Sequence, residues 1–295
     1  MSPPVAIPIP DRRGAAAENP AKGPPLEGFD QFFFEAQGMG HSVYYTGGRQ
    51  HPALLVLPEI AGFSPGLLLL VERLARARFQ VYVPWLFGPF GRRAPVRNAL
   101  RLCVSREFAH LREGVSAPIA SWLRALASHV SDHNNGGRIG AIGMCLTGAF
   151  AIPLVIDPTV AAAVAAQPSA PLSFLHAAFG LRTNERRLGA LNISDADIAD
   201  ARSRLSSGEA QMLAMRCRAD RICPRDKIER LQREFPIGLD VREYGQPDDR
   251  NRLGDRPHAT LTKEYRLETD VPPEHHSRQA FADLIAFFDR HLRKP

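Results

Sequence analysis

The chain has 295 residues, 44% of them hydrophobic, so it can bury the core of one large domain or of two small ones. Its formal net charge is +6, but the basic residues are spread as single or paired arginines, which argues against a specific nucleic-acid-binding protein. The longest apolar run, residues 67–71, is too short to span a bilayer, and residues 5–10 are too short and proline-rich for a signal peptide, so we expect a soluble cytoplasmic protein.

The N-terminal part of the chain changes from a low-complexity segment to strand-like patterns. Residues 1–27 are rich in proline, alanine, glycine and charge without an amphipathic period, which predicts a disordered tail. Residues 31–46 indicate two strands joined by a glycine turn. The apolar run 53–58 predicts a strand buried on both faces of a parallel sheet, and the loop 59–66 leads into a predicted helix over residues 67–78.

The rest of the chain alternates between helical and strand-like patterns. The alternation indicates an α/β protein with a mostly parallel sheet that helices cover on both faces. Residues 168–193 show no clean period and stay unassigned. The further predicted elements are strands over 79–84, 138–144, 160–166, 211–217 and 238–244, and helices over 97–113, 117–131, 146–156 (shortened by Pro153), 194–206, 224–235 and 276–292.

Residues 138–150 carry the most informative pattern for chemistry. A short apolar run leads to Cys145, which Gly143 and Gly148 flank, and a helix-like pattern follows at once. A strand, a sharp turn and a helix in this order expose the side chain at the turn above the sheet. Cys145 is therefore a candidate nucleophile, because a thiol needs only modest help to become a thiolate.

A cysteine nucleophile needs a base, and the base needs an orienting carboxylate. Asp220 follows one predicted strand and His258 follows the last one, so both fall in loops at strand ends. Asp220 could instead cap the helix that opens at residue 224, and Asp226 inside that helix is a rival acid. His275 and His276 are the rivals of His258.

The cysteines and histidines give no metal or disulfide signature. Cys103, Cys145, Cys217 and Cys223 form no C-x-x-C pair and no zinc-like spacing. Reduced thiols in a cytoplasm are the default for such a chain, and a free cysteine in an apolar setting is usually a buried small hydrophobe. The adjacent pair of histidines at 275–276 has no accompanying ligand set, so we expect neither a metal nor a cofactor.

Four local motifs resemble those of the dienelactone hydrolases, which are α/β-hydrolases with a cysteine nucleophile. Residues 143–148 (Gly-Met-Cys-Leu-Thr-Gly) resemble the family's Gly-x-Cys-x-Gly-Gly elbow, and residues 58–62 (Pro-Glu-Ile-Ala-Gly) resemble its Gln-Glu-Ile-Phe-Gly loop. Residues 220–224 resemble the Asp-x-x-x-Pro segment, and residues 257–260 (Pro-His-Ala-Thr) resemble Gly-His-Ser-Phe. The resemblance covers about residues 28–292 and implies an α/β-hydrolase fold.

The resemblance implies a role for each of these positions. Cys145 would be the nucleophile, His258 the general base and then acid, and Asp220 the carboxylate that orients it. Glu59 would take part in switching the thiol to a thiolate when substrate arrives. Before that, a buried carboxylate next to the thiol should keep the resting cysteine neutral, because a neighbouring negative charge raises the pKa of a thiol.

The resemblance also implies how substrate would be held. The backbone N–H groups of Ile60 and Leu146 would form the oxyanion hole. Arg106 would be an anion-binding residue. Glu59 could alternatively be an ordinary surface residue.

Three positions depart from the family pattern. Thr147 replaces an elbow glycine, so its side chain should crowd the turn or narrow the pocket. Pro257 precedes the histidine where the family often has glycine, which restricts the approach of the loop. Thr262 stands where the family has a substrate-binding arginine. The departures leave the predicted hydrolase activity intact and leave open whether dienelactone itself is a substrate.

We therefore predict a tail over residues 1–27 followed by one α/β-hydrolase domain over residues 28–295, as a monomer or dimer. The domain would hydrolyse a small carboxylic ester or lactone through an acyl-enzyme on Cys145, with no metal, cofactor, nucleic-acid or membrane partner. The alternative is a catalytically retired scaffold that binds a small ligand or a protein, a function that Thr147 and Pro257 would favour.

Overall fold

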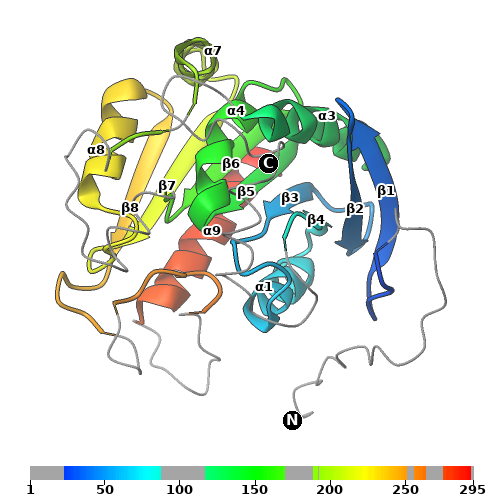
Figure 1. Ribbon diagram of the computed structural model, residues 1–295, viewed down its shortest axis with the longest axis horizontal. Helices are drawn as coiled ribbons and strands as arrows, with labels where there is room; N and C mark the ends of the chain where they lie inside the picture. The colour runs from blue at the N-terminus through cyan, green and yellow to red at the C-terminus, as the bar shows by residue number, and fades with distance from the viewer. Residues whose placement is uncertain are drawn as a thin grey trace.

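The computed structural model describes residues 23–87, 117–169, 189–191, 193–250, 256–263 and 275–293. An eight-stranded sheet forms the centre of the molecule, in the order β1-β2-β4-β3-β5-β6-β7-β8 (Figure 1). β1 and β2 pair antiparallel, β2 also pairs antiparallel with β4, and every other pair is parallel. The strands are β1 (Asp30–Ala36), β2 (Met39–Thr46), β3 (Ala53–Leu57), β4 (Gln80–Pro84), β5 (Ile139–Met144), β6 (Val160–Ala166), β7 (Gln211–Cys217) and β8 (Leu239–Tyr244).

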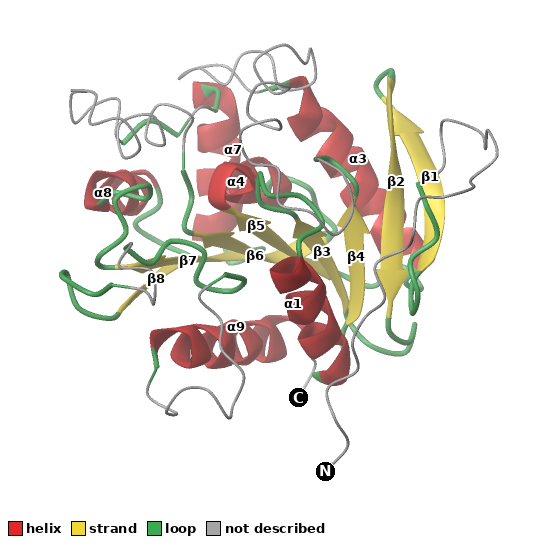
Figure 2. Cartoon of the chain, turned by 60° about the horizontal axis from the view of Figure 1, so that its bottom comes forward, coloured by secondary structure: helices red, strands yellow, loops and turns green. Residues whose placement is uncertain are grey.

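Helices cover both faces of this sheet, as Figure 2 shows. One face packs against α1 and α9, and the other packs against α3, α4, α7 and α8. The arrangement is the α/β-hydrolase fold that the sequence predicts. The helices are α1 (Pro65–Arg76), α3 (Pro118–His133), η2 (Cys145–Phe150, a 3₁₀ helix), α4 (Ala151–Val155), α7 (Asp195–Ser206), α8 (Arg225–Glu234) and α9 (His276–Leu292).

The central strands are apolar along their whole length because both of their faces are covered. Every residue of β3, β5 and β6 is buried. Along β3, Leu55 and Leu57 join the core beneath α3, whereas Leu54 and Val56 join the core beneath α1 and α9. A strand with two covered faces shows no polar alternation, which explains the continuous apolar run in the sequence.

The segment after β5 differs from the predicted single helix over residues 146–156. It begins with the 3₁₀ helix η2, and α4 adds only five residues. The Thr147 side chain bonds to the N–H of Met144 and lies 2.9 Å from its carbonyl oxygen, at the point where the strand passes into η2. Pro153 lies within α4, where its ring and missing N–H keep the helix short.

The structure bears on two further expectations. Gly23 donates its N–H to Ser42, the Tyr44 hydroxyl bonds to Pro24, and Leu26 is buried, so the last residues of the predicted tail pack on the sheet. The predicted helix over 97–113 lies outside the described residues.

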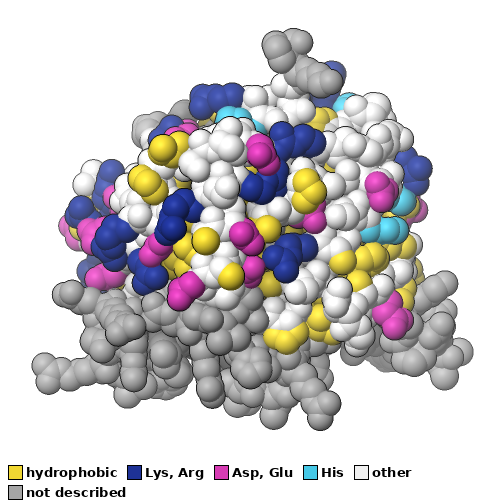
Figure 3. Space-filling view, turned by 90° about the horizontal axis from the view of Figure 1, so that it is seen from above, with side chains coloured by type: hydrophobic (Ala, Val, Ile, Leu, Met, Phe, Trp, Pro, Cys, Tyr) yellow, Lys and Arg dark blue, Asp and Glu magenta, His cyan; other side chains and the backbone are white. Residues whose placement is uncertain are grey.

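Two further observations concern the charges on the surface and the apolar character of the helices. On the face in Figure 3, basic and acidic side chains are interspersed, with no gathering of a single sign. Among the described helices, none combines the length and the apolar character that crossing a bilayer requires.

Candidate active site

Cys145 lies on a strained turn at the carboxyl end of β5. Its φ of 56° is in the left-handed region, which residues other than glycine and asparagine rarely adopt. Two glycines make the turn possible. A Cβ on Gly143 would lie 2.2 Å from the carbonyl oxygen of Thr147, and one on Gly148 would lie 2.8 Å from the Cα of Pro168. Strain of this kind persists where the surrounding structure enforces it, which is typical of functional turns.

Asp220 and His258 form a direct contact at the carboxyl edge of the sheet. His258 Nδ1 lies 2.7 Å from Asp220 Oδ2, and Pro257 does not keep the histidine away from the acid. The Asp220 side chain is 1% exposed and that of His258 is 16% exposed, so only the histidine is open to a substrate. His258 Nε2 is buried, and the ring interacts with Cys145, although Nε2 forms no regular hydrogen bond with a described residue.

The Asp220 side chain holds its own loop through hydrogen bonds to two backbone N–H groups. Asp220 Oδ1 accepts from the N–H groups of Ile222 and Cys223 at 2.8 and 3.1 Å, which leaves Oδ2 for His258. The carboxylate therefore braces its own loop, and the cap of α8 is Pro224 without a side-chain bond. The rival acid, Asp226, lies in the first turn of α8.

The buried guanidinium of Arg216 also holds this loop, through hydrogen bonds to its backbone carbonyls. Its Nε donates to the carbonyl of Cys223 at 2.9 Å, and Nη2 donates to the carbonyls of Arg218 and Asp220 at 3.1 and 3.2 Å. Nη1 forms an ion pair with Glu243 at 2.6 Å. A rigid planar fork of donors suits this task, because it binds several carbonyls at once.

Glu59 lies at the end of β3 and contacts two neutral donors. Its Oε1 accepts a hydrogen bond from Thr262 Oγ1 at 2.9 Å and from Gln167 Nε2 at 3.1 Å. Gln167 is fully buried and has a φ of 37°, a second strained position next to the predicted site. Glu59 is therefore connected both to the loop of His258, through Thr262, and to the end of β6.

A comparison with protein families identifies the family of this chain. Residues 41–187 match the model described as the dienelactone hydrolase family, a span that includes Glu59 and Cys145. The chain belongs to the dienelactone hydrolase family. Membership supports hydrolase activity, and the matched span ends before Asp220 and His258.

Solved structures give the same fold for members of the dienelactone hydrolase family. A Klebsiella pneumoniae protein assigned as a dienelactone hydrolase has 17% identity and a TM-score of 0.59, over 89% of this chain and 98% of that one. The Anabaena variabilis dienelactone hydrolase has 13% identity and a TM-score of 0.55, over 90% and 100% of the two chains.

A third similar structure is a promiscuous phosphotriesterase from metagenomic libraries that resembles dienelactone hydrolases. It has 15% identity and a TM-score of 0.54, over 88% of this chain and 97% of that one. No protein with a curated description matches the sequence. At these identities the structural likeness establishes the fold.

His258 carries a shifted pKa in this member of the dienelactone hydrolase family. Burial lowers the pKa of His258, but the negative charge of Asp220, the neighbouring sulfur of Cys145 and the hydrogen bond to Asp220 outweigh it. The net result is a pKa well above the ordinary value of 6.5. A proton on His258 is therefore favoured near neutral pH, where it faces a carboxylate on one side and a sulfur on the other.

We expect an NMR titration of the His258 ring to give a pKa above 6.5 in the wild-type protein. Asp220→Asn should lower this pKa, because it removes the charge that stabilises the imidazolium while the burial stays. Asp226→Asn serves as the matched control and should leave the pKa of His258 in place. An unchanged pKa in Asp220→Asn would contradict the assigned pairing.

Thr147 has a structural role in the elbow of this dienelactone hydrolase family member. Its fully buried hydroxyl accepts from the N–H of Met144 at 2.9 Å. The same hydroxyl lies within hydrogen-bond distance of the carbonyls of Leu57, Pro58 and Met144, and its single proton can serve one of them at a time. The side chain thus ties the Cys145 turn to the loop of Glu59.

We expect Thr147→Val to destabilise the fold by about 1–3 kcal/mol, because it leaves a buried N–H and buried carbonyls without their partner. Thr147→Ser keeps the hydroxyl and should lose much less. Urea unfolding of the two variants measures the difference. Equal losses would assign the effect to the missing or added methyl groups and not to the hydrogen bonds.

The two predicted oxyanion-hole residues lie on different elements. Leu146 is the second residue of η2, where backbone N–H groups have no acceptor within the helix. Ile60 follows Glu59 in a turn that the bond from the N–H of Gly62 to the carbonyl of Glu59 closes at 2.8 Å. Arg106, the predicted anion-binding residue, lies outside the described residues.

Sequence reasoning missed Ser169, whose Oγ lies 3.3 Å from Cys145 Sγ. It also missed Gln167 and Arg216. Gln167 and Ser169 follow β6 directly, and loops after the carboxyl ends of parallel strands commonly carry functional side chains. Their position directly after β6 could have indicated these two residues. The segment 168–193 was left unassigned because it shows no clean period.

The two other described cysteines, Cys217 and Cys223, have buried thiols that we do not expect to react. Burial raises the pKa of Cys223, and the charge of Asp220 raises it further, so its thiol is inert. Cys217 is buried with its Sγ 3.2 Å from Thr260 Oγ1. Both agree with the interpretation of these residues as buried hydrophobes, and Cys103 lies outside the described residues.

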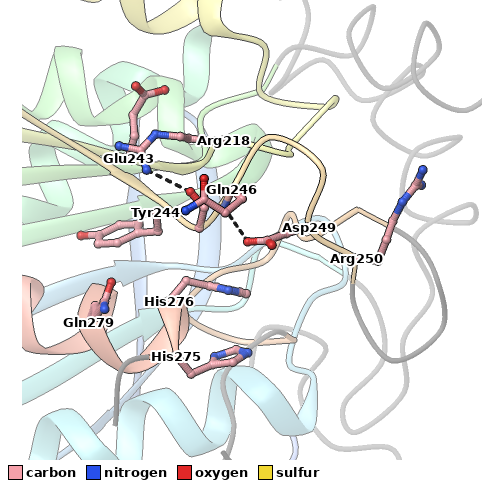
Figure 4. Close-up of a pocket in the computed structure, with 10 residues that line it drawn as sticks. Arg218, Glu243, Tyr244, Gln246, Asp249, Arg250, His275, His276 and Gln279 are labelled. Atoms are coloured by element: carbon pink, nitrogen blue, oxygen red, sulfur yellow. Dashed lines mark hydrogen bonds between the residues drawn. The ribbon is translucent and has the colours of Figure 1, made fainter. Parts of the chain in front are cut away.

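A separate polar pocket lies where β8 ends and α9 begins, and it contains none of the predicted catalytic residues. Its volume is about 510 Å³. Figure 4 shows His275 and His276 side by side at this pocket, with their ring centroids 4.1 Å apart. No group of metal-ligating side chains occurs within the described part of the chain, so the histidine pair has no supporting ligands there. The lining residues are Arg218, Glu243, Tyr244, Gly245, Gln246, Asp249, Arg250, His275, His276 and Gln279.

Proposed function

We propose that this protein hydrolyses a carboxylic ester or lactone through a Cys145–His258–Asp220 triad and a thioester intermediate. The observation that carries the proposal is the placement of a strained cysteine beside a histidine that a buried carboxylate holds at 2.7 Å. A nucleophile, a base and an orienting acid in this relation are the requirements of acyl transfer.

The reaction would proceed in two halves. The Cys145 thiolate attacks the ester carbonyl, and the negative oxygen of the tetrahedral intermediate binds to the N–H groups of Ile60 and Leu146. Collapse of the intermediate releases the alcohol or enol, which takes a proton from the His258 imidazolium. His258 then accepts a proton from water, the hydroxide attacks the thioester, and the carboxylic acid leaves as Cys145 regains its negative charge.

The raised pKa of His258 supports the first half of this sequence. A proton held on His258 is available to the departing alcohol or enol, which needs it when the tetrahedral intermediate collapses.

The contacts of Thr262 favour an ester without a carboxylate beside the reacting carbonyl. Thr262 donates its hydroxyl proton to Glu59 at 2.9 Å, so this position offers a neutral and occupied donor. Because the single hydroxyl proton is already donated to Glu59, a substrate anion would gain neither a hydrogen bond nor a positive charge from this position. We therefore propose simple esters or lactones as substrates and not the anionic dienelactone.

The proposal is tested by the hydrolysis of p-nitrophenyl acetate. We expect the wild-type protein to show turnover and Cys145→Ala to show none above the uncatalysed rate. The matched control is Cys217→Ala, because Cys217 is also a buried free cysteine but bonds to Thr260. Equal rates for the wild-type protein and Cys145→Ala would favour the alternative, a retired scaffold that binds a ligand or protein.

A further inference from the structure

Ser169 contacts the predicted nucleophile through both its backbone and its side chain. Its N–H donates to the carbonyl oxygen of Cys145 at 3.0 Å, and its Oγ lies 3.3 Å from the sulfur. The residue is 4% exposed, so the contact is protected from water. The backbone bond holds this segment on the elbow, and among the described residues the hydroxyl contacts the sulfur.

The direction of the Ser169 hydroxyl bond depends on the state of the sulfur. A neutral thiol can donate to the hydroxyl or accept from it, whereas a thiolate has no proton and can only accept. Hydrogen bonds to a charged acceptor are stronger than those between neutral groups. A buried O–H group at this distance therefore stabilises the thiolate more than the thiol, and this difference lowers the pKa of a cysteine.

The other titratable groups around Cys145 have different tasks. His258 faces the sulfur from the loop after β8, with Asp220 behind it. Cys223, in the loop after β7, stays neutral because it is buried. Glu59, after β3, directs Oε1 to Gln167 and Thr262. Ser169 is the neutral donor that approaches the sulfur from the end of β6.

We propose that Ser169 is a positioning residue for the nucleophile, which holds Cys145 Sγ in place and stabilises its thiolate. The inference rests on the proposed function for its role in turnover. The predicted effect of Ser169 on the acidity of the Cys145 thiol does not depend on whether the protein hydrolyses an ester. The Cys145 thiolate would then have two donors, the His258 imidazolium and the Ser169 hydroxyl, so removing the hydroxyl should weaken the nucleophile without abolishing it.

The test measures the rate at which iodoacetamide alkylates Cys145 as a function of pH, with Cys145→Ala as the background. We expect Ser169→Ala to slow alkylation at pH 7 by about tenfold and to move its midpoint to higher pH, because one charge-assisted hydrogen bond is lost. Ser169→Thr keeps the hydroxyl and should restore the wild-type profile. Ser169→Gly is a second deletion of the hydroxyl, and thermal unfolding confirms that each variant is folded.

Two results would overturn the inference. One is an alkylation profile of folded Ser169→Ala or Ser169→Gly that superposes on the wild-type profile. The other is a wild-type Cys145 that reacts no faster than the background. Hydrolysis of p-nitrophenyl acetate is measured in parallel, and we expect kcat to fall while KM stays the same. A wild-type protein that alkylates rapidly but hydrolyses no ester would contradict the proposed function and leave the inference on Ser169 supported.

Discussion

Asp220→Asn is expected to lower kcat for ester hydrolysis on the order of 10³-fold to 10⁴-fold, an effect of the size known for the orienting acid of a Ser-His-Asp triad. The amide that replaces Oδ2 can present an N–H to His258, which holds the ring in the wrong tautomer. It also removes the charge that stabilises the imidazolium at 2.7 Å. KM should change little, because Asp220 is 3% exposed and cannot contact a substrate.

Asp226→Asn is the matched control for this prediction. Asp226 lies six positions further along the same chain segment, in the first turn of α8, and has no place in the proposed mechanism. Its replacement should leave kcat within a factor of about two, since surface substitutions usually change free energies by less than 0.5 kcal/mol. A large loss in Asp226→Asn together with an active Asp220→Asn would reverse the assignment of the acid.

Gly143→Ala is expected to destabilise the fold by about 3 kcal/mol or more, a large share of the typical stability of a domain. The added Cβ would lie 2.2 Å from the Thr147 carbonyl oxygen and 2.8 Å from its carbon, and both are backbone atoms that cannot rotate away. The turn at Cys145 would have to open, so activity should fall with stability. Urea unfolding and the hydrolysis rate measure the two effects.

Gly137→Ala provides the comparison for Gly143→Ala. Its added Cβ would meet nothing closer than the Asn134 carbonyl oxygen at 3.8 Å, and its φ is not in the left-handed region. We expect this variant to be as stable as the wild type or slightly more stable, because alanine restricts the unfolded chain. If both variants lost the same free energy of unfolding, the loss in Gly143→Ala would not come from crowding of the turn at Cys145.

The fold could be predicted from the sequence because its central strands are buried on both faces. Continuous apolar runs such as those of β3 and β6 are typical of strands inside a parallel sheet, and the alternation with helical patterns fixes the class. The ends of the strands then indicate where side chains converge. This reasoning placed Asp220 and His258 in neighbouring loops, and the structure joins them.

The remaining parts of the site depend on contacts between segments that are distant in sequence. Thr147 was expected to crowd the turn, but its hydroxyl lies within bonding distance of carbonyls 89 and 90 residues away. Ser169 reaches Cys145 across 24 residues, and Gln167 reaches Glu59 across 108. No local period or propensity encodes such contacts, so a side chain that acts through them is invisible until the strands are placed side by side.

The most direct test of the account is mass spectrometry of the protein quenched in acid during the hydrolysis of p-nitrophenyl acetate. A digest should show one acetyl group on the peptide that contains Cys145, and hydroxylamine should remove it, since the bond is a thioester. The acetyl group should be absent from Cys145→Ala and should accumulate in a variant that slows deacylation. Turnover of the ester without any acyl group on Cys145, or acylation of another residue instead, would contradict the central claim.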